Sequence, residues 1–371
     1  MQASVRLGRI FGIPIGLHSS WFLIFGLVTW SLAAGYFPPE YPNLPRVAYW
    51  VLGGVTSILF FASVLAHEMG HSVVALRNQV PVRGITLFIF GGVAQIGREP
   101  PTPGAEFRIA IAGPLTSLAL SGVFAGLWLL DQAVPYLAAP SIWLARINLI
   151  LAVFNMIPGF PLDGGRVLRA IVWKLTGNFY RATQVASFSG QLVAFGFIGF
   201  GALTMLTGNL FNGLWLVFIG WFLQNAAATA YAQTNIQELL RDVTVAQAMT
   251  QECALVPDNI SLQRLVEDYV LTGGRRCFFI ADQDRLRGLL SLSDVAKIPR
   301  DNWVAVAVGD VMVPWERLIR VETTTPLLRA LQIMDDANVS QVPVVSAGRL
   351  VGMLSREHVL RYIRTRAELG I

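Results

Sequence analysis

The residues with the clearest capacity for chemistry form the run His67-Glu68-Met69-Gly70-His71. On a helix, residues i and i+4 share a face, so His67 and His71 can present two imidazoles to one metal ion. Glu68 follows the first histidine and can act as the general base toward an attacking water. The chain has only four histidines, and the chance expectation for this spacing is about one in a thousand. The alternative, two buried histidines with a structural role, gives no reason to place three polar groups in an apolar helix.

A catalytic zinc ion usually has three protein ligands, and a carboxylate is a suitable third. The candidate is Asp163, which ends the stretch Asn-Met-Ile-Pro-Gly-Phe-Pro-Leu-Asp at 155–163. The two prolines interrupt a helix, and irregular backbone at membrane depth requires protein or a wet cavity around it. Taken alone, Asp163 is better explained as the N-cap of a helix that begins at Gly164. Beside two histidines that lack a third ligand, coordination is favoured.

The chain that positions these residues consists largely of membrane helices. Of its 371 residues, 54% are hydrophobic and 14% charged, against about 25% charged in a soluble protein. Residues 1–231 contain 12 Lys and Arg with 6 Asp and Glu, whereas residues 232–371 contain 16 and 17. We therefore expect a polytopic α-helical membrane domain followed by a soluble domain, which excludes an ordinary cytosolic enzyme. Arginines that flank spans explain the basic excess, so no nucleic-acid partner is expected.

Six apolar stretches are long enough to cross a bilayer, which takes about 20 residues. They are expected near 17–36, 47–76, 106–130, 141–157, 185–207 and 210–231. The first could instead be a signal peptide, but its long apolar run in a polytopic protein favours a span. Basic residues gather before the first span and after the second and fourth, so both termini are expected in the cytoplasm. The protein is expected to be a multi-pass protein of the cell membrane.

Most acidic residues of this domain are expected to have no part in the chemistry. Four of the six fall in or beside connecting loops: Glu40, Glu99, Glu106 and Asp131. The other two, Glu68 and Asp163, lie near the cytoplasmic ends of the second and fourth spans. Ionisable groups at such positions are costly and mark functional sites. The topology thus places the glutamate, the aspartate and both histidines at one depth.

The two motifs together resemble those of the site-2 proteases, zinc metalloproteases that cut peptide bonds inside the membrane. The resemblance rests on 67–71 and on 155–164 as Asn-x-x-Pro-x-x-Pro-x-Asp-Gly, and it covers most of residues 1–231. Lesser features are Gly91-Gly92 and Ala112-Gly113-Pro114. Family members often have an Asn shortly after that Gly-Pro pair, where this chain has Leu115-Thr116-Ser117, so this stretch receives no role.

The resemblance implies that His67, His71 and Asp163 bind one zinc ion, that Glu68 is the catalytic base, and that Asn155 lies close to the substrate or the developing oxyanion. It also implies a transmembrane protein substrate in the lipid bilayer, such as a membrane-bound regulator or an anti-sigma factor.

Residues 83–97 predict two short β runs broken by Gly91-Gly92, too short to form a span. This re-entrant β-hairpin could offer an edge strand to an extended substrate, which assigns Gly91 and Gly92 to substrate binding. A hairpin with only a structural role explains the pattern equally well.

The soluble part, after a linker at 232–243, contains two similar units at 244–300 and 301–371. Each has a Val-x-x-x-Met start, an amphipathic helix, a β run and a Gly-hydrophobic-hydrophobic-Ser segment, at a spacing of about 60 residues. They resemble a tandem pair of CBS domains, α/β modules that commonly bind adenine nucleotides. The resemblance assigns Ser291, Ser293 and Asp294 to ATP, ADP or AMP, while His358 replaces the matching Asp of the second copy. A pair that serves only homodimer formation or gating is the alternative.

Two other functions fit parts of the sequence. In a CBS-regulated channel or transporter, the histidines and acids would line an ion path, but such a path requires neither motif. An inactive metal-binding membrane scaffold does not require Glu68. Cys253 and Cys277 are too few for a disulfide framework or a cysteine metal site. The sequence therefore favours an intramembrane zinc metalloprotease with a CBS pair.

Overall fold

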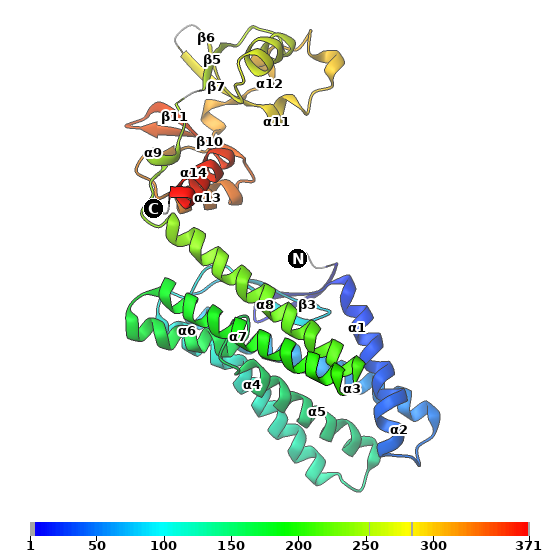
Figure 1. Cartoon of the computed structure of the whole chain (residues 1–371). Helices are drawn as coiled ribbons and strands as arrows, with labels where there is room; N and C mark the ends of the chain where they lie inside the picture. The colour runs from blue at the N-terminus through cyan, green and yellow to red at the C-terminus, as the bar shows by residue number, and fades with distance from the viewer. Residues whose placement is uncertain (1–3, 252, 283–284, 370–371) are drawn as a thin grey trace. The chain divides into compact units, whose positions relative to one another are not determined.

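The computed structural model describes residues 4–251, 253–282 and 285–369 (Figure 1). The chain divides into two compact units, Met1–Thr234 and Asn235–Ile371. Each unit has its own clusters of buried side chains, including one around Phe37 in the first and one around Phe278 in the second.

Within the described residues, the first unit has six helical segments long and apolar enough to span a membrane, which confirms the polytopic fold. The first segment, Ser19–Glu40, consists of α1 (Ser19–Trp30), η1 (Ser31–Tyr36) and α2 (Phe37–Glu40). The others are α3 (Arg46–Arg77), α4 (Pro103–Leu130), α5 (Pro135–Asn155), α7 (Phe179–Leu206) and the part of α8 (Leu210–Leu239) that ends at Ala232. Helix α8 thus continues through much of the predicted linker.

Helix α3 carries the two histidines and Glu68. It begins after Pro45, which cannot donate a backbone hydrogen bond, and its 32 residues extend about 48 Å at 1.5 Å per residue. Helix α3 packs against α1, α4 and α5, and its buried residues include small polar ones such as Thr56, Ser57 and Ser72. These small side chains allow the close approach that membrane helices require.

The chain breaks between α5 and α6 (Asp163–Thr176), where the prolines predicted an interruption. Glycines permit the tight path of this loop. A Cβ on Gly164 would lie 2.4 Å from Ile157 O, and a Cβ on Gly190 of α7 would lie 2.0 Å from Phe160 O. The loop is therefore packed tightly on itself and on α7. It ends at Asp163, the first residue of α6.

A four-stranded sheet packs on α3. Its strands follow the order β1 (Val5–Ile10), β2 (Ile13–Leu17), β3 (Val82–Phe88) and β4 (Gly91–Ile96). The pairs β1–β2 and β3–β4 are antiparallel and β2–β3 is parallel. Ile13, Ile15 and Ile85 are buried with Met69 of α3. The β3–β4 hairpin is the predicted one, whereas the N-terminal hairpin was not predicted, because its parallel partner β3 lies more than sixty residues away.

The second unit contains two α/β modules of like order. The first sheet has the order β5 (Ala254–Pro257), β6 (Cys277–Asp282), β7 (Arg285–Ser291) and β8 (Val313–Pro314), and the second has β11 (Arg349–Ser355), β10 (Gln341–Ser346) and β9 (Val321–Glu322). The helices are α9 (Val245–Ala248), α10 (Leu262–Arg264), η2 (Leu265–Thr272), α11 (Leu292–Val295), η3 (Arg300–Asn302), α12 (Val308–Val311), η4 (Trp315–Arg317), α13 (Leu327–Asp336) and α14 (Arg356–Leu369). Val245 of α9 is buried in the core of the second module and Val308 of α12 in that of the first. The opening segment of each copy therefore packs in the other copy.

Candidate active site and nucleotide cleft

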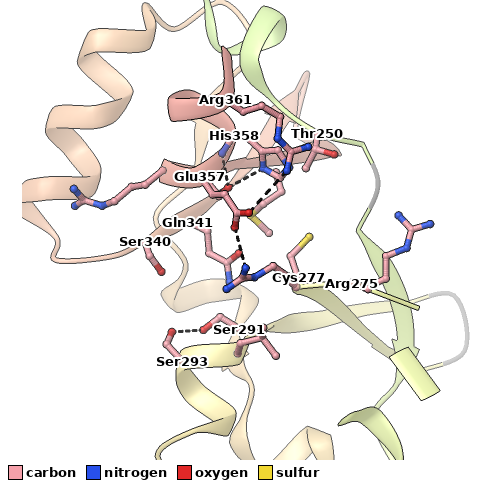
Figure 2. A pocket seen from close by; sticks show the side chains of 16 residues that line it. Thr250, Arg275, Cys277, Ser291, Ser293, Ser340, Gln341, Glu357, His358 and Arg361 are labelled. Carbon is pink, nitrogen blue, oxygen red and sulfur yellow. Dashed lines mark hydrogen bonds and ion pairs between the residues drawn. The ribbon is translucent and has the colours of Figure 1, made fainter. Parts of the chain in front are cut away.

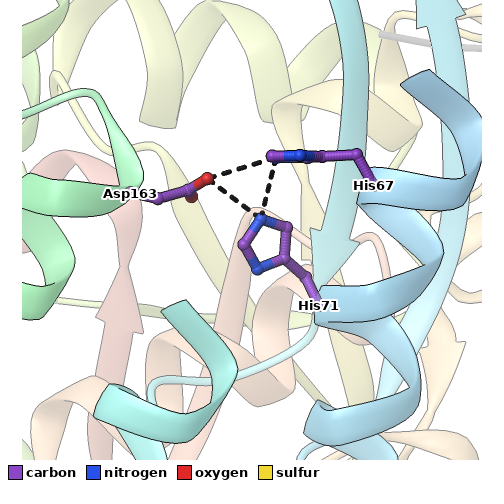
Figure 3. Close-up of side chains that lie close together, drawn as sticks. All are labelled: His67, His71 and Asp163. Atoms are coloured by element: carbon purple, nitrogen blue, oxygen red, sulfur yellow. Dashed lines mark hydrogen bonds and ion pairs between the residues drawn. The ribbon is translucent and has the colours of Figure 1, made fainter. Parts of the chain in front are cut away.

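His67 and His71 of α3 meet Asp163 of α6 (Figure 3). Asp163 Oδ2 lies 3.2 Å from His67 Nε2 and 3.1 Å from His71 Nε2, and the two Nε2 atoms are 3.2 Å apart. Both histidines are 4% exposed. Four ligands about 2.05 Å from one tetrahedral zinc ion lie about 3.3 Å apart. The spacing and the donor set of two imidazoles and one carboxylate therefore fit zinc.

Helix α4 holds the other nitrogen of each imidazole. His71 Nδ1 lies 2.7 Å from Ile109 O, and His67 Nδ1 lies 2.8 Å from Ser117 Oγ. A carbonyl oxygen only accepts, so the proton of neutral His71 is on Nδ1 and the Nε2 lone pair is free for a metal. The Ser117 hydroxyl can accept from His67 in the same way. No role was predicted for Ser117, because no local pattern marks a residue 50 positions from its partner.

The close contact between α4 and the two imidazoles accounts for Gly113, the central residue of Ala112-Gly113-Pro114. A Cβ at this position would lie 2.1 Å from His71 Nε2 and 2.7 Å from His67 Nε2. No side chain fits there without displacing an imidazole. Only glycine lets α4 approach the two imidazoles this closely.

Glu68, Asn155, Gly91 and Gly92 line a single cavity of about 550 Å³ together with the three proposed ligands. Strand β4 forms one wall, and a Cβ on Gly92 would lie 2.5 Å from Glu68 Cγ. Further lining residues are mostly apolar, and they include Phe60, Phe61, Phe90 and Trp215. The structure thus brings together all the site residues predicted in the membrane domain.

Asp163 is not the N-cap of α6. Leu162 occupies that position, and its side chain makes no capping bond. The Asp163 carboxylate instead points toward the two imidazoles. This geometry favours coordination over the capping alternative.

Glu106 was expected in or beside a connecting loop, and its burial was not predicted. Glu106 is in the first turn of α4 with 0% exposure, and Arg169 Nε of α6 donates to its Oε1 at 2.6 Å. The Arg169 guanidinium lies 5.0 Å from the ring centroid of Phe160 and 4.6 Å from that of Phe179. Because Asp163 begins α6, this buried ion pair ties the helix of the proposed third ligand to α4, whose Ile109 and Ser117 contact the two imidazoles.

A second cavity, of about 480 Å³, lies between the two modules of the second unit (Figure 2). Ser291 and Ser293 line it from the first copy, with their Oγ atoms 2.7 Å apart. The second copy contributes polar and charged residues: Ser340, Gln341, Ser355, Arg356, Glu357, His358 and Arg361. Glu357 forms ion pairs with Arg276 at 3.5 Å and with Arg361 at 3.8 Å. The cleft therefore offers hydroxyls and guanidinium groups, which suit a phosphorylated ligand.

Asp294 is engaged in its own helix turn. Its carboxylate accepts from Ser291 Oγ at 2.5 Å and from Lys297 Nζ at 2.8 Å. Burial alone would raise the pKa of the Asp294 carboxyl, but the hydrogen bonds of Lys297 and Ser291 outweigh burial and lower the pKa below its ordinary value. Among the described residues, those that line the cleft do not include Asp294. At the matching position of the second copy, His358 Nδ1 lies 2.7 Å from Ser355 Oγ.

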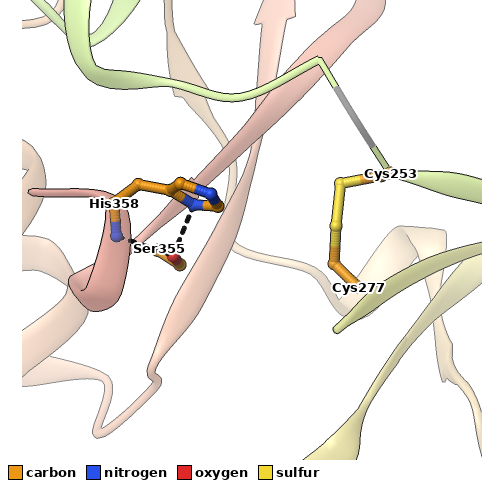
Figure 4. The surroundings of a disulfide bond; sticks show 4 residues. All are labelled: Cys253, Cys277, Ser355 and His358. Atoms are coloured by element: carbon orange, nitrogen blue, oxygen red, sulfur yellow. Dashed lines mark hydrogen bonds between the residues drawn. A yellow bond between two sulfur atoms is a disulfide. The ribbon is translucent and has the colours of Figure 1, made fainter. Parts of the chain in front are cut away.

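Cys253 and Cys277 form a disulfide beside this cleft (Figure 4). Their spacing alone did not predict this bond. The pairing follows from the sheet, in which β5 and β6 are parallel neighbours with Ala254 opposite Phe278. The two cysteines are thus adjacent residues at the starts of neighbouring strands.

Comparisons with known proteins identify relatives of both parts of the chain. Peptidase family M50 matches residues 55–138 and 131–198, and the CBS domain matches 308–365. The provisionally named zinc metalloprotease sll0528 of Synechocystis sp. is 37% identical over 99% of this chain and 97% of its own length. Zinc metalloprotease MJ0392 of Methanocaldococcus jannaschii is 30% identical over 97% of this chain and 96% of its own. The solved site-2 protease from that organism is 32% identical and covers 61% of this chain and 94% of its own, with a TM-score of 0.42.

A buried set of zinc-type ligands beside a glutamate, within six membrane helices, defines the class of intramembrane metalloproteases. The matches over nearly the whole chain then show that it belongs to peptidase family M50, the site-2 proteases. It is a zinc-dependent protease of the membrane with a C-terminal CBS region.

Proposed function

We propose that His67, His71 and Asp163 hold the zinc ion and that Glu68 is the catalytic base. The observation that carries this assignment is the approach of two Nε2 atoms and one carboxylate oxygen to within 3.2 Å in a cavity that Glu68 also lines. Asp163→Asn keeps the size of the side chain but weakens it as a ligand. We expect this variant to lose zinc, as measured by metal analysis. Retention of a full equivalent of zinc would contradict the assignment.

The chemistry requires a nucleophile and a place for the proton. A bound zinc ion supplies Lewis acidity, which polarises the scissile carbonyl and lowers the pKa of water toward about 7. Glu68 takes the proton from the attacking water and returns it to the leaving amine nitrogen. Asn155 ends α5 at the cavity wall and offers its amide to the substrate carbonyl. The apolar walls exclude bulk water and so strengthen these interactions.

The substrate binds in extended form along β4. A helical substrate protects its peptide bonds, so its segment must unwind before attack. Strand β4 is an edge of the sheet, and it begins at Gly91-Gly92 within the catalytic cavity. Main-chain pairing to this edge would place a peptide beside Glu68.

The natural substrate is a membrane-spanning protein, for which a membrane-bound regulator or an anti-sigma factor is our proposal. The arginine distribution supports a protein of the cell membrane with both termini in the cytoplasm. Comparison of membrane proteomes from cells with the wild type and with Glu68→Gln tests this directly. We expect uncut single-span proteins to accumulate with the variant. Identical proteomes would contradict the proposal.

The cleft of the second unit binds an adenine nucleotide, ATP, ADP or AMP, chiefly through Ser291 and Ser293 of the first copy. The hydroxyl pair and the neighbouring arginines support this proposal. Calorimetry on the full chain in detergent should show heat with at least one of the three nucleotides, reduced in the Ser291→Ala, Ser293→Ala double variant. No heat with any of them would favour a CBS pair that only mediates homodimer formation.

A further inference from the structure

The sheet face that points away from α3 carries three arginines around a groove. Arg6 and Arg9 belong to β1 and Arg83 belongs to β3. All three are exposed, and they line a cavity of about 650 Å³. Its other lining residues are mostly small or uncharged: Gly8, Pro14, Ile15, Gly16, Gly84, Ile85, Thr86 and Gln95. The groove is distinct from the catalytic cavity and shares no lining residue with it.

The strand register explains the shape of this groove. Arg6 pairs with Gly16 and Arg9 pairs with Pro14, and residues opposite each other on paired strands share a face. At the centre, a Cβ on Gly84 would lie only 3.1 Å from Pro14 O. Pro14, Gly16 and Gly84 therefore form a low floor of small residues between β1 and the start of β3. Arg6 and Arg9 line this floor from β1, and Arg83 lines it from β3.

Within the described residues, no carboxylate forms an ion pair with Arg6, Arg9 or Arg83. The ion pairs in the described part of the first unit are made by His67, His71 and Arg169. Three guanidinium groups around one groove repel one another, and an anion between them would relieve this repulsion. Guanidinium groups match the geometry of phosphate oxygens through paired hydrogen bonds.

The connections of the sheet place it at the membrane boundary. One residue separates the end of β2 from the start of α1, and four residues separate the end of α3 from β3. Both helices belong to membrane spans. The hairpin β1–β2 also exposes apolar side chains, with Leu7 at 58% and Phe11 at 76% exposure. Arginines and exposed apolar groups on one hairpin suit the interface between headgroups and acyl chains.

We propose that this groove binds the phosphate headgroup of an anionic phospholipid, with Leu7, Ile10 and Phe11 in contact with its acyl chains. With the proposed orientation, the groove faces the cytoplasmic leaflet, where anionic lipids attract basic residues. A bound lipid would hold the β1–β2 hairpin, and through it the sheet, against the bilayer.

The test uses the full chain in maltoside detergent, with bound lipids counted by native mass spectrometry. We expect the wild type to bind dioleoylphosphatidylglycerol roughly tenfold more tightly than dioleoylphosphatidylcholine. The variant Arg6→Gln, Arg9→Gln, Arg83→Gln should lose this preference. A matched control removes the same charge from exposed residues outside the groove, through Arg77→Gln, Lys174→Gln and Arg181→Gln, and it should keep the preference.

Three results would overturn the proposal. The first is an equal loss of preference in both variants, which would reflect net charge alone. The second is displacement of phosphatidylglycerol by millimolar inorganic phosphate, which would indicate a site for a free anion. The third is a groove variant that keeps its lipid preference but no longer cleaves a reporter with an acidic cytoplasmic flank. That result would assign the arginines to a peptide.

Discussion

Replacement of Gly113 by alanine should empty the zinc site while leaving the helices in place. The added Cβ would lie 2.1 Å from His71 Nε2 and 2.7 Å from His67 Nε2, whereas an ordinary contact begins near 3.4 Å. The His71 ring must therefore withdraw by the difference, 1.3 Å. Zinc sites tolerate deviations of only about 0.2 Å in ligand distance. Loss of a hydrogen-bond partner of a metal ligand typically lowers metal affinity by roughly 10–100-fold, and we expect a larger fall in zinc affinity here.

The assay is zinc competition against a chelator of known affinity, with the purified protein in detergent. Helix α4 supplies matched controls, since a Cβ on Gly122 or Gly126 meets nothing within 4 Å. Gly122→Ala should bind zinc as the wild type does, so a general effect of alanine in α4 would be visible. Wild-type zinc affinity in Gly113→Ala would refute the proposed packing of α4 against the ligands.

Three further substitutions separate the parts of the site. Ser117→Ala should lower zinc affinity about 10–100-fold, because His67 loses its Nδ1 partner; Ser121→Ala, which removes a buried hydroxyl of the same helix, should not, and equal affinities would contradict the role of Ser117. Gly92→Ala places a Cβ 2.5 Å from Glu68 Cγ and so displaces this side chain. It should abolish most cleavage with zinc content unchanged. Full activity would show that the position of Glu68 does not depend on Gly92. Arg169→Gln leaves its buried carboxylate partner without a counter-charge and should destabilise the fold by about 3–5 kcal/mol. A thermal unfolding midpoint equal to that of the wild type would contradict this last expectation.

Local periodicity explains which site residues could be predicted. His67 and His71 share a helix face by their spacing alone, and Glu68 is their sequence neighbour. Asp163 followed from the need for a third ligand and from prolines that stop a helix. Each inference needed only the properties of one segment and the chemistry of zinc.

The residues that sequence reasoning missed act across segments. Ser117 is identified only once α3 and α4 are packed, since 50 positions separate it from His67. The burial of Glu106 was not predicted, because its partner Arg169 lies 63 positions away. The β1–β2 hairpin and the Cys253–Cys277 bond likewise depend on strand neighbours that no short window contains. Conversely, Asp294 matches a nucleotide motif, but its carboxylate is engaged by Ser291 and Lys297.

Cleavage of a membrane-spanning reporter by purified Glu68→Gln, with bound zinc counted in the same sample, tests the central claim most directly. The substitution keeps the shape of the side chain and removes only its ability to take a proton. The proposed role of Glu68 predicts one zinc ion per chain and loss of nearly all cleavage, with the exposed carboxylate variant Glu40→Gln active as a control. Cleavage by Glu68→Gln at the wild-type rate would contradict the assignment of the catalytic base.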